Sequence, residues 1–117
     1  MRPTVLVVDD HAEFRASARA LLESEGFEVV GDVAGGLAAL EAVERIRPQV
    51  VLLDVQLPDL DGFAVADRLA SGSARPDVVL VSGRDTRTYA ARIGAADVRG
   101  FIAKDDLSGA ALARLLA

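Results

Sequence analysis

The sequence VVLLDVQLPDLDG, residues 50–62, places four large aliphatic residues directly before a carboxylate, Asp54. Prolines bound the stretch at positions 48 and 58, and a continuous apolar run of this kind predicts a strand that is buried on both faces. Turn-forming residues follow from Pro58 to Gly62, so the strand must end near Asp54. Asp54 is therefore predicted at the carboxyl end of a buried, parallel strand, which is the edge where open α/β sheets bind ligands.

Length and composition predict one domain over residues 1–117. Hydrophobic residues make up 51% of the chain and its mean hydropathy is +0.30, but no apolar run approaches the ~18 residues that span a bilayer. Two aspartates, Asp9 and Asp10, come too early for a secretory signal. The chain has no cysteine and one histidine, which leaves neither a disulfide framework nor a zinc site. A cytoplasmic protein without membrane contact is expected.

The charged residues argue against nucleic-acid binding by this chain and single out one lysine. A net charge of −5 is unfavourable for binding phosphates, which requires a basic surface. Twelve of the 13 cations are arginine, and Lys104 is the single lysine. Composition alone leaves chance and function equally open as the reason for that lysine.

Apolar runs and helical patterns alternate five times along the chain. Strands are predicted over residues 4–8, 28–33, 50–54, 77–82 and 98–103, and helices over residues 11–25, 37–46, 63–69, 85–93 and 107–116. Gly26 is placed to end the first helix, and the weaker pattern of 28–33 predicts a strand near a sheet edge. The alternation predicts an α/β fold with parallel strands and helical crossovers.

Each long apolar strand ends on a chemically capable group. These groups are Asp9, Asp10, Asp54, Ser82 and Lys104. A parallel sheet brings the ends of its strands to one edge, so we expect the five side chains to converge. Two carboxylates ~4 Å apart repel by about 4 kcal/mol at an effective dielectric near 20, so such a site needs a cation.

The chemistry of this set favours a magnesium-assisted phosphoryl transfer. A few oxygen ligands suit Mg²⁺, which commonly bridges carboxylates to a phosphate. A carboxylate beside bound Mg²⁺ and a lysine is a nucleophile towards phosphorus and gives an acyl phosphate. The lysine and the hydroxyl then stabilise charge on the transferred group.

Over essentially its whole length, the sequence resembles the receiver domains of bacterial two-component response regulators. The residues that carry the resemblance are the acidic pair Asp9-Asp10, the segment DVQLPDLDG from Asp54, Ser82, Phe101 and Lys104. The resemblance implies a flavodoxin-like, doubly wound sheet of five parallel strands in the order 2-1-3-4-5 with helices on both faces. It also implies a phosphoacceptor that assists its own phosphorylation and dephosphorylation, rather than an enzyme with a separate substrate.

The resemblance further implies a role for each acidic residue. Asp54 is the expected phosphoacceptor. Asp10, Asp54 and the backbone carbonyl of Gln56 are the expected Mg²⁺ ligands, and Asp9 is expected to act mainly through water. No other cofactor is implied.

Three further residues are implied to sense the phosphoryl group. Ser82 is expected to hydrogen-bond it, Lys104 to pair with it, and Phe101 to move inward on activation. Phosphorylation is expected to alter the face built from the 85–93 helix, the fifth strand and the last helix. Phe101 stands where many receivers have tyrosine, and Asp105 stands where many have proline, which excludes a cis-proline there.

The implied partners are a sensor histidine kinase or a histidine phosphotransfer protein, and a second copy of the chain on activation. The segment DDHAEFR and the carboxyl-terminal tail resemble the NarL-like subfamily, which carries a helix-turn-helix output domain, so DNA would be contacted only through such a domain. His11 is interpreted as a subfamily or helix-start residue, because a metal-binding histidine needs partners that the chain lacks. Tyr89 is interpreted as a packing residue.

Two other classes of site are disfavoured, and one question stays open. A nucleotide-binding fold would have a glycine-rich loop after the first strand, where Asp9 and Asp10 stand. A phosphatase of the haloacid dehalogenase type needs a second aspartate where Gln56 stands. The subfamily resemblance favours the regulatory part of a transcription factor, whereas the acidic charge favours a free-standing receiver that acts as a phosphorelay carrier or binding module.

Overall fold

A five-stranded parallel sheet forms the centre of the molecule. The computed structural model describes residues 2–83, 87 and 89–117. The strands are β1 (Thr4–Val8), β2 (Glu28–Val33), β3 (Val50–Asp54), β4 (Asp77–Ser82) and β5 (Gly100–Ala103), and they are ordered β2-β1-β3-β4-β5. All four pairings are parallel. The predicted fold class and strand order are confirmed, and β2 lies at an edge as its weaker pattern indicated.

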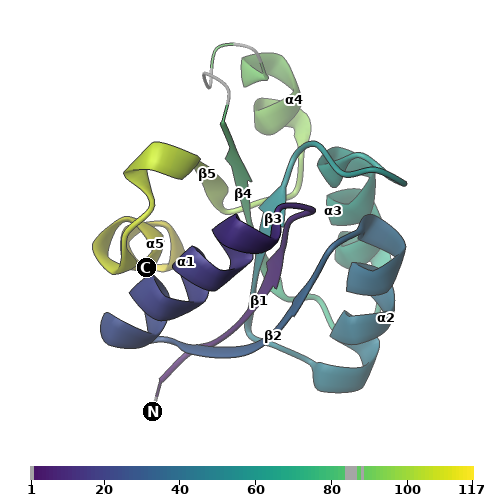
Figure 1. Cartoon of the computed structure of the whole chain (residues 1–117). Helices are drawn as coiled ribbons and strands as arrows, with labels where there is room; N and C mark the ends of the chain where they lie inside the picture. Colours follow the sequence, from purple (N-terminus) through teal and green to yellow (C-terminus); the bar gives the residue numbers. More distant parts are fainter. Residues whose placement is uncertain (1, 84–86, 88) are drawn as a thin grey trace.

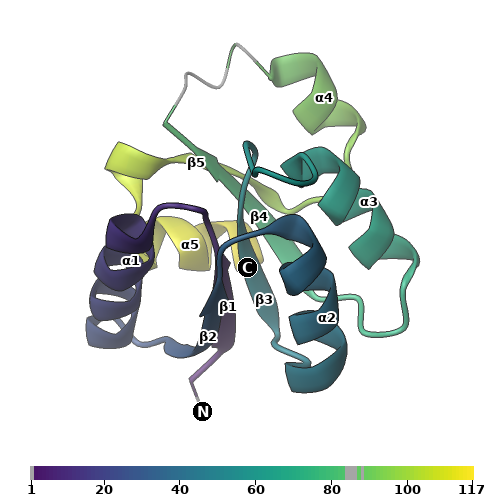
Figure 2. The ribbon, with the colours of Figure 1, turned by 45° about the vertical axis from the view of Figure 1, so that its right-hand side comes forward.

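Helices cover both faces of the sheet (Figures 1 and 2). They are α1 (Ala12–Ser24), α2 (Gly36–Ile46), α3 (Gly62–Ser71), α4 (Ala90–Ala95) and α5 (Gly109–Leu116), with a 3₁₀ turn at Lys104–Asp106. Helices α1 and α5 lie on one face, and α2 and α3 lie on the other, with α4 beyond α3. No helix in the described ranges is long and apolar enough to cross a membrane.

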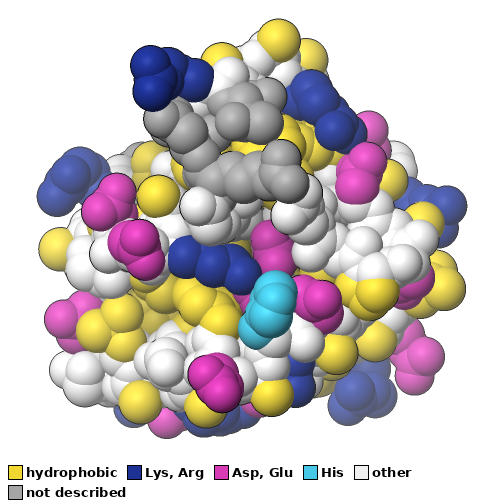
Figure 3. All heavy atoms as spheres, turned by 45° about the horizontal axis from the view of Figure 1, so that its top comes forward, with side chains coloured by type: hydrophobic (Ala, Val, Ile, Leu, Met, Phe, Trp, Pro, Cys, Tyr) yellow, Lys and Arg dark blue, Asp and Glu magenta, His cyan; other side chains and the backbone are white. Residues whose placement is uncertain are grey.

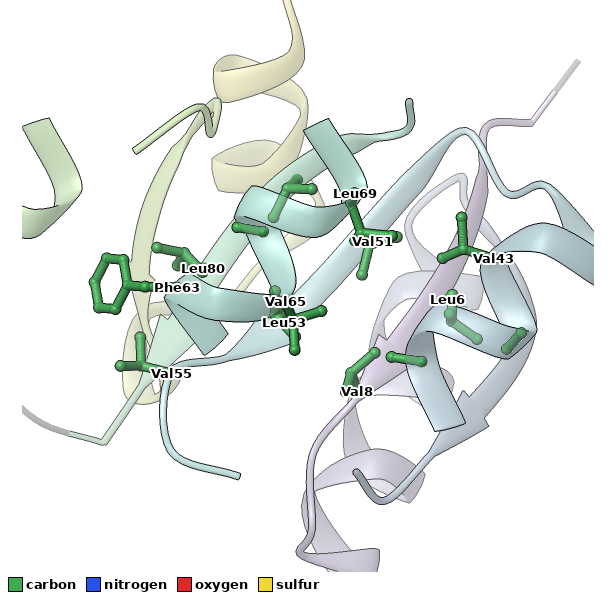
Figure 4. Close-up of a cluster of buried hydrophobic side chains, with 14 of the residues drawn as sticks. Leu6, Val8, Val43, Val51, Leu53, Val55, Phe63, Val65, Leu69 and Leu80 are labelled. Atoms are coloured by element: carbon green, nitrogen blue, oxygen red, sulfur yellow. The ribbon is translucent and has the colours of Figure 1, made fainter. Parts of the chain in front are cut away.

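The strands are apolar at consecutive positions because both of their faces are buried. Leu6, Val51 and Leu53 point to the side of α2 and α3, where they pack in the cluster shown in Figure 4. The alternate residues, such as Val7 and Leu52, join a second cluster with α1 and α5. Every residue of β3 is buried, which the continuous run of residues 50–54 predicted.

The first three helices were predicted to within two residues at each end, and the larger differences at the starts of elements lie in the last third of the chain. Helix α4 covers residues 90–95 instead of 85–93; positions 84–86 and 88 lie outside the described residues. Strand β5 begins at Gly100 instead of position 98, because its pairing with β4 begins there. The last helix begins at Gly109 instead of position 107, because the Ser108 side chain accepts a hydrogen bond from Ala111 N and caps it there.

Candidate active site

The strand ends converge at one edge of the sheet, as the sequence predicted. Asp9 and Asp10 follow β1, Asp54 is the last residue of β3, and Ser82 is the last residue of β4. Lys104 begins the 3₁₀ turn that follows β5. Figure 3 shows acidic and basic side chains gathered here around the single histidine. We call Asp9, Asp10 and Asp54 the acidic pocket.

Lys104 links two carboxylates of the acidic pocket. Its Nζ lies 2.6 Å from Oδ2 of Asp9 and 3.3 Å from Oδ2 of Asp54. The side chains of Asp9 and Asp54 are only 0% and 5% exposed, and that of Lys104 is 18% exposed. The only lysine of the chain is therefore a half-buried partner of two buried carboxylates.

The pKa values of Asp9 and Lys104 show that this pair is charged. Burial on its own would raise the pKa of Asp9, but the ammonium of Lys104 and the backbone N–H of His11 bring that pKa below its ordinary value. Burial would lower the pKa of Lys104, but Asp9 and Asp54 raise it above its ordinary value. Both groups are therefore ionised at neutral pH.

The pKa of Asp54 is shifted in the opposite direction to that of Asp9. Burial raises its pKa above the ordinary value, and the negative charge of Asp9 raises it further. The backbone N–H of Gln56, 3.2 Å from Oδ1 of Asp54, and the ammonium of Lys104 offset this only in part. The negative charge of Asp54 is thus less well compensated by the protein than that of Asp9.

The acidic pocket suits a hard divalent cation. Asp9, Asp10, His11 and Asp54 can each offer one ligand atom, and these atoms all lie within 4.8 Å of one another. Oδ2 of Asp9 is buried, and its partner in the described part of the chain is the ammonium of Lys104. Several carboxylate oxygens around one point form a donor set that Mg²⁺ prefers.

His11 contacts both aspartates that precede it, although no partner was predicted for it. It precedes α1, as interpreted, but its Nδ1 lies 3.0 Å from Oδ1 of Asp9 and 3.1 Å from Oδ1 of Asp10. The stated reason for excluding it as a ligand, a lack of partners, is therefore wrong. Adjacency in sequence to the acidic pair was a signal that could have indicated this contact.

The loop after β3 fixes the position of Asp54. The N–H of Gly62 donates to the carbonyl of Val55 at 2.7 Å, and a Cβ at position 62 would lie 2.4 Å from the backbone oxygen of Asp54. Only glycine lets the start of α3 pack so closely against the end of β3. The side chain of Asp61 accepts from the N–H of Ala64 at 2.8 Å and caps α3.

Asp59 ties the same loop to a second helix. Its two carboxylate oxygens accept hydrogen bonds from the N–H groups of Gly36 and Leu37, at 2.8 and 2.9 Å. N–H groups in the first turn of a helix have no carbonyl partner within that helix, and Asp59 supplies one from outside. These hydrogen bonds lower the pKa of Asp59. Turn chemistry was predicted here, but the partner helix could not be, because it lies 22 residues or more away in sequence.

The proposed sensing residues lie along one side of the site. Ser82 is buried and pairs in register with Ala103, next to Lys104. Phe101 is half-buried, and its ring centre lies 6.5 Å from that of Tyr89, which lies 5.9 Å from that of Phe63. Tyr89 is buried in the core beside α3, which confirms its interpretation as a packing residue.

Two residues of α1 contact the site without having been predicted to do so. The ring of Phe14 lies under Nζ of Lys104, with 4.6 Å between the nitrogen and the ring centre. Arg15 donates a hydrogen bond to the backbone oxygen of Asp9 at 2.7 Å and another to the carboxylate of Asp32 at 2.9 Å. Helical spacing had placed Phe14 on the apolar face of α1, and nothing in that spacing indicates a cation above its ring.

Comparisons with known proteins agree with this geometry. The family model of the response regulator receiver domain matches residues 5–115. The chain is 35% identical over 102 residues to the transcription regulator BvgA of Bordetella pertussis, which covers 87% of this chain and 49% of that protein. It is 42% identical over 88 residues to the DNA-binding response regulator MtrA of Mycobacterium leprae. This alignment covers 74% of this chain and 38% of that protein. The chain thus spans about half the length, or less, of these curated relatives.

Solved structures give the same result. The signal receiver domain of the response regulator NarL from Mycobacterium tuberculosis superposes with a TM-score of 0.86 at 33% identity, covering 99% of this chain and 98% of that chain. The response regulator domain of CheB from Thermotoga maritima also gives a TM-score of 0.86, at 23% identity, covering 99% and 95% of the two chains. At that identity the second match shows the fold alone.

Proposed function

Because the chain belongs to the family of response regulator receiver domains, we propose that Asp54 takes a phosphoryl group from a phosphohistidine in a Mg²⁺-dependent reaction. One observation carries the proposal. Asp54 is buried at the carboxyl end of β3, beside Asp9 and 3.3 Å from the only lysine. The donor is a sensor histidine kinase or a histidine phosphotransfer protein. The P–N bond of the donor breaks, and a P–O bond to the carboxylate of Asp54 forms.

Mg²⁺ would be held by Asp10, Asp54 and the backbone carbonyl of Gln56, with Asp9 contributing mainly through water. When bound, the ion neutralises charge on the carboxylates and on the phosphoryl oxygens. Support comes from the convergence of Asp9, Asp10, His11 and Asp54, whose possible ligand atoms lie within 4.8 Å of one another.

The other residues of the site hold the reacting groups. Lys104 already contacts Asp54 and has three N–H donors, so its ammonium is placed to meet a phosphoryl oxygen. Ser82 supplies a hydroxyl from the neighbouring strand. The Gln56 N–H donates to Oδ1 of Asp54 and orients the carboxylate. The chain in this role assists its own phosphorylation and dephosphorylation and turns over no separate substrate.

Incubation with acetyl phosphate and Mg²⁺ tests the proposed function directly. Intact-mass measurement should show one added phosphoryl group, because the site needs only a reactive phosphoryl donor and the metal. Chelation of Mg²⁺ with EDTA should prevent the addition. Equal labelling with and without EDTA would contradict a metal-dependent receiver.

The output of the domain is proposed from its relatives. BvgA is named a transcription regulator and MtrA a DNA-binding response regulator, and the chain spans half or less of each. We infer that the native protein regulates transcription through a helix-turn-helix domain, with DNA contacted by that domain and not by this chain, whose net charge is −5. A free-standing receiver is the alternative, and the length of the reading frame that encodes the chain distinguishes the two.

The proposed output face comprises α4, β5 and α5. A hollow of about 270 Å³ lies on it, lined by Phe101, Asp106, Arg114 and Leu115 among others. Phe101 borders this hollow on one side and contacts Tyr89 on the other, so its ring has two neighbouring environments to occupy. We propose that a movement of Ser82 towards the phosphoryl group lets Phe101 move inward and that the altered face pairs with a second copy of the chain.

Phe101→Ala is expected to uncouple this face from the phosphorylation site. Phosphorylation of Asp54 should stay within about twofold of the unchanged protein, because the ring packs against Tyr89 and the hollow on the output face. Beryllofluoride with Mg²⁺ should shift amide NMR signals of residues 90–116 in the unchanged protein and much less in the variant. Signal changes confined to the surroundings of Asp54 in both proteins would contradict the proposed switch.

A further inference from the structure

Phe14 is the residue whose position the proposed function does not yet explain. It lies on the apolar face of α1, one and two helical repeats before Ala18 and Leu22, and it packs against the core cluster between α1, α5 and the sheet. A residue that only fills space in the core would need no more than apolar neighbours around its ring. The ring instead lies under the ammonium itself, with Nζ 4.6 Å from its centre, which is within the range of a cation–π interaction.

The ring is suited to hold the ammonium without occupying its hydrogen-bond donors. Lys104 lies 2.6 Å from Asp9 but 3.3 Å from Asp54, so the carboxylates on their own draw it towards Asp9. An aromatic face attracts the positive charge through its quadrupole and accepts no directed hydrogen bond. The three N–H groups of the ammonium therefore stay available to the carboxylates and to a group transferred to Asp54.

We propose that Phe14 is a positioning residue for phosphoryl transfer: the face of its ring holds the ammonium of Lys104 over the acidic pocket, where it meets the phosphoryl group on Asp54. The inference rests on the proposed function. The contact joins α1 to the turn after β5. Loss of the electrostatic attraction should slow phosphorylation by about threefold to tenfold.

A series of fluorinated phenylalanines at position 14 isolates this attraction from packing. Fluorine withdraws electron density from the ring, so 4-fluoro-, 3,5-difluoro- and 3,4,5-trifluorophenylalanine weaken the cation–π contact stepwise and keep the shape of the side chain. The rate of phosphorylation by acetyl phosphate with Mg²⁺ should fall at each step. The affinity for beryllofluoride should fall in parallel.

Phe27 provides the matched control. It is buried in the same core cluster. The same fluorinated series at position 27 alters an apolar contact of similar size, away from the ring that lies under Lys104, and should leave the rate unchanged.

A spectroscopic measurement follows the lysine directly. Because Lys104 is the only lysine, ¹³C-labelled lysine gives a single set of side-chain NMR signals. The signal of the methylene next to Nζ should be displaced by the ring current of Phe14, and Phe14→Leu should remove the displacement.

The outcomes separate this inference from the proposed function. If the unchanged protein takes up no phosphoryl group, the proposed function fails and the inference fails with it. If it is phosphorylated but the series at positions 14 and 27 give equal rates, or the lysine signal shows no ring-current displacement, Phe14 is a packing residue and the inference is overturned.

Discussion

Asp54→Asn is expected to abolish phosphoryl uptake completely. The amide has no negative oxygen with which to attack phosphorus and is a poorer ligand for Mg²⁺ than the carboxylate. Intact-mass measurement after incubation with acetyl phosphate and Mg²⁺ should show no adduct. Asp67→Asn is the matched control, because Asp67 is exposed on α3, and it should be phosphorylated like the unchanged protein.

The same variant should be more stable than the unchanged protein at neutral pH without Mg²⁺. The folded-state pKa of Asp54 is raised by burial and by the charge of Asp9. A carboxyl group of this kind favours the fold only while it is protonated, and this contribution is lost as the pH rises through its folded-state pKa. Above that pKa the ionised group destabilises the fold, and asparagine removes that charge. Urea unfolding should show the gain, which should shrink as the pH is lowered and Asp54 takes up a proton.

These two measurements exclude misfolding as the reason for lost phosphorylation. A variant that still takes up one phosphoryl group would place the nucleophile at another residue. A variant that is less stable at neutral pH would contradict the electrostatic description of the acidic pocket.

Lys104→Arg is expected to reduce the phosphorylation-driven change at the output face by roughly tenfold or more, although the charge is kept. The ammonium fits between Asp9 and Asp54 as a compact point charge, whereas a guanidinium is a broad, planar fork. The arginine would therefore pair with a carboxylate from further out and present its donors at the wrong angle to the phosphoryl group. Amide NMR shifts of residues 90–116 with beryllofluoride and Mg²⁺ measure the response.

Arg99→Lys is a suitable control for the exchange of cation type. Arg99 is an exposed residue just before β5 that pairs with Asp77 and with the backbone oxygen of Leu116. The altered geometry of one surface ion pair should change the free energy of unfolding by less than about 1 kcal/mol and leave the response intact. A normal response in Lys104→Arg would show that the site requires positive charge alone.

Most of the central sheet could be predicted because its signals are local. The strands predicted from the apolar runs of β1, β3 and β4 have the same bounds in the structure. A strand buried on both faces is apolar at nearly every position, so its two ends are easy to recognise in the sequence. The end of α1 was equally clear, because Gly26 has the positive φ of 100° that glycine readily adopts. The boundaries of α4, β5 and α5 were less accurate, since they depend on pairing with β4 and on capping by Ser108.

The sequence by itself determined the fold class and which chemical groups stand at the ends of the strands, because strand periodicity and residue type are properties of neighbouring positions. The tertiary structure alone decided how those groups meet. It places Lys104 closer to Asp9 than to Asp54, brings His11 against both carboxylates that precede it, and sets the ring of Phe14 under the ammonium. The pKa of Asp9 falls and that of Asp54 rises because burial and charge act on each through residues up to about a hundred positions away in the chain. Such contacts leave no periodic signal in the sequence, since each side chain that makes them also fits the local pattern of its own helix or strand.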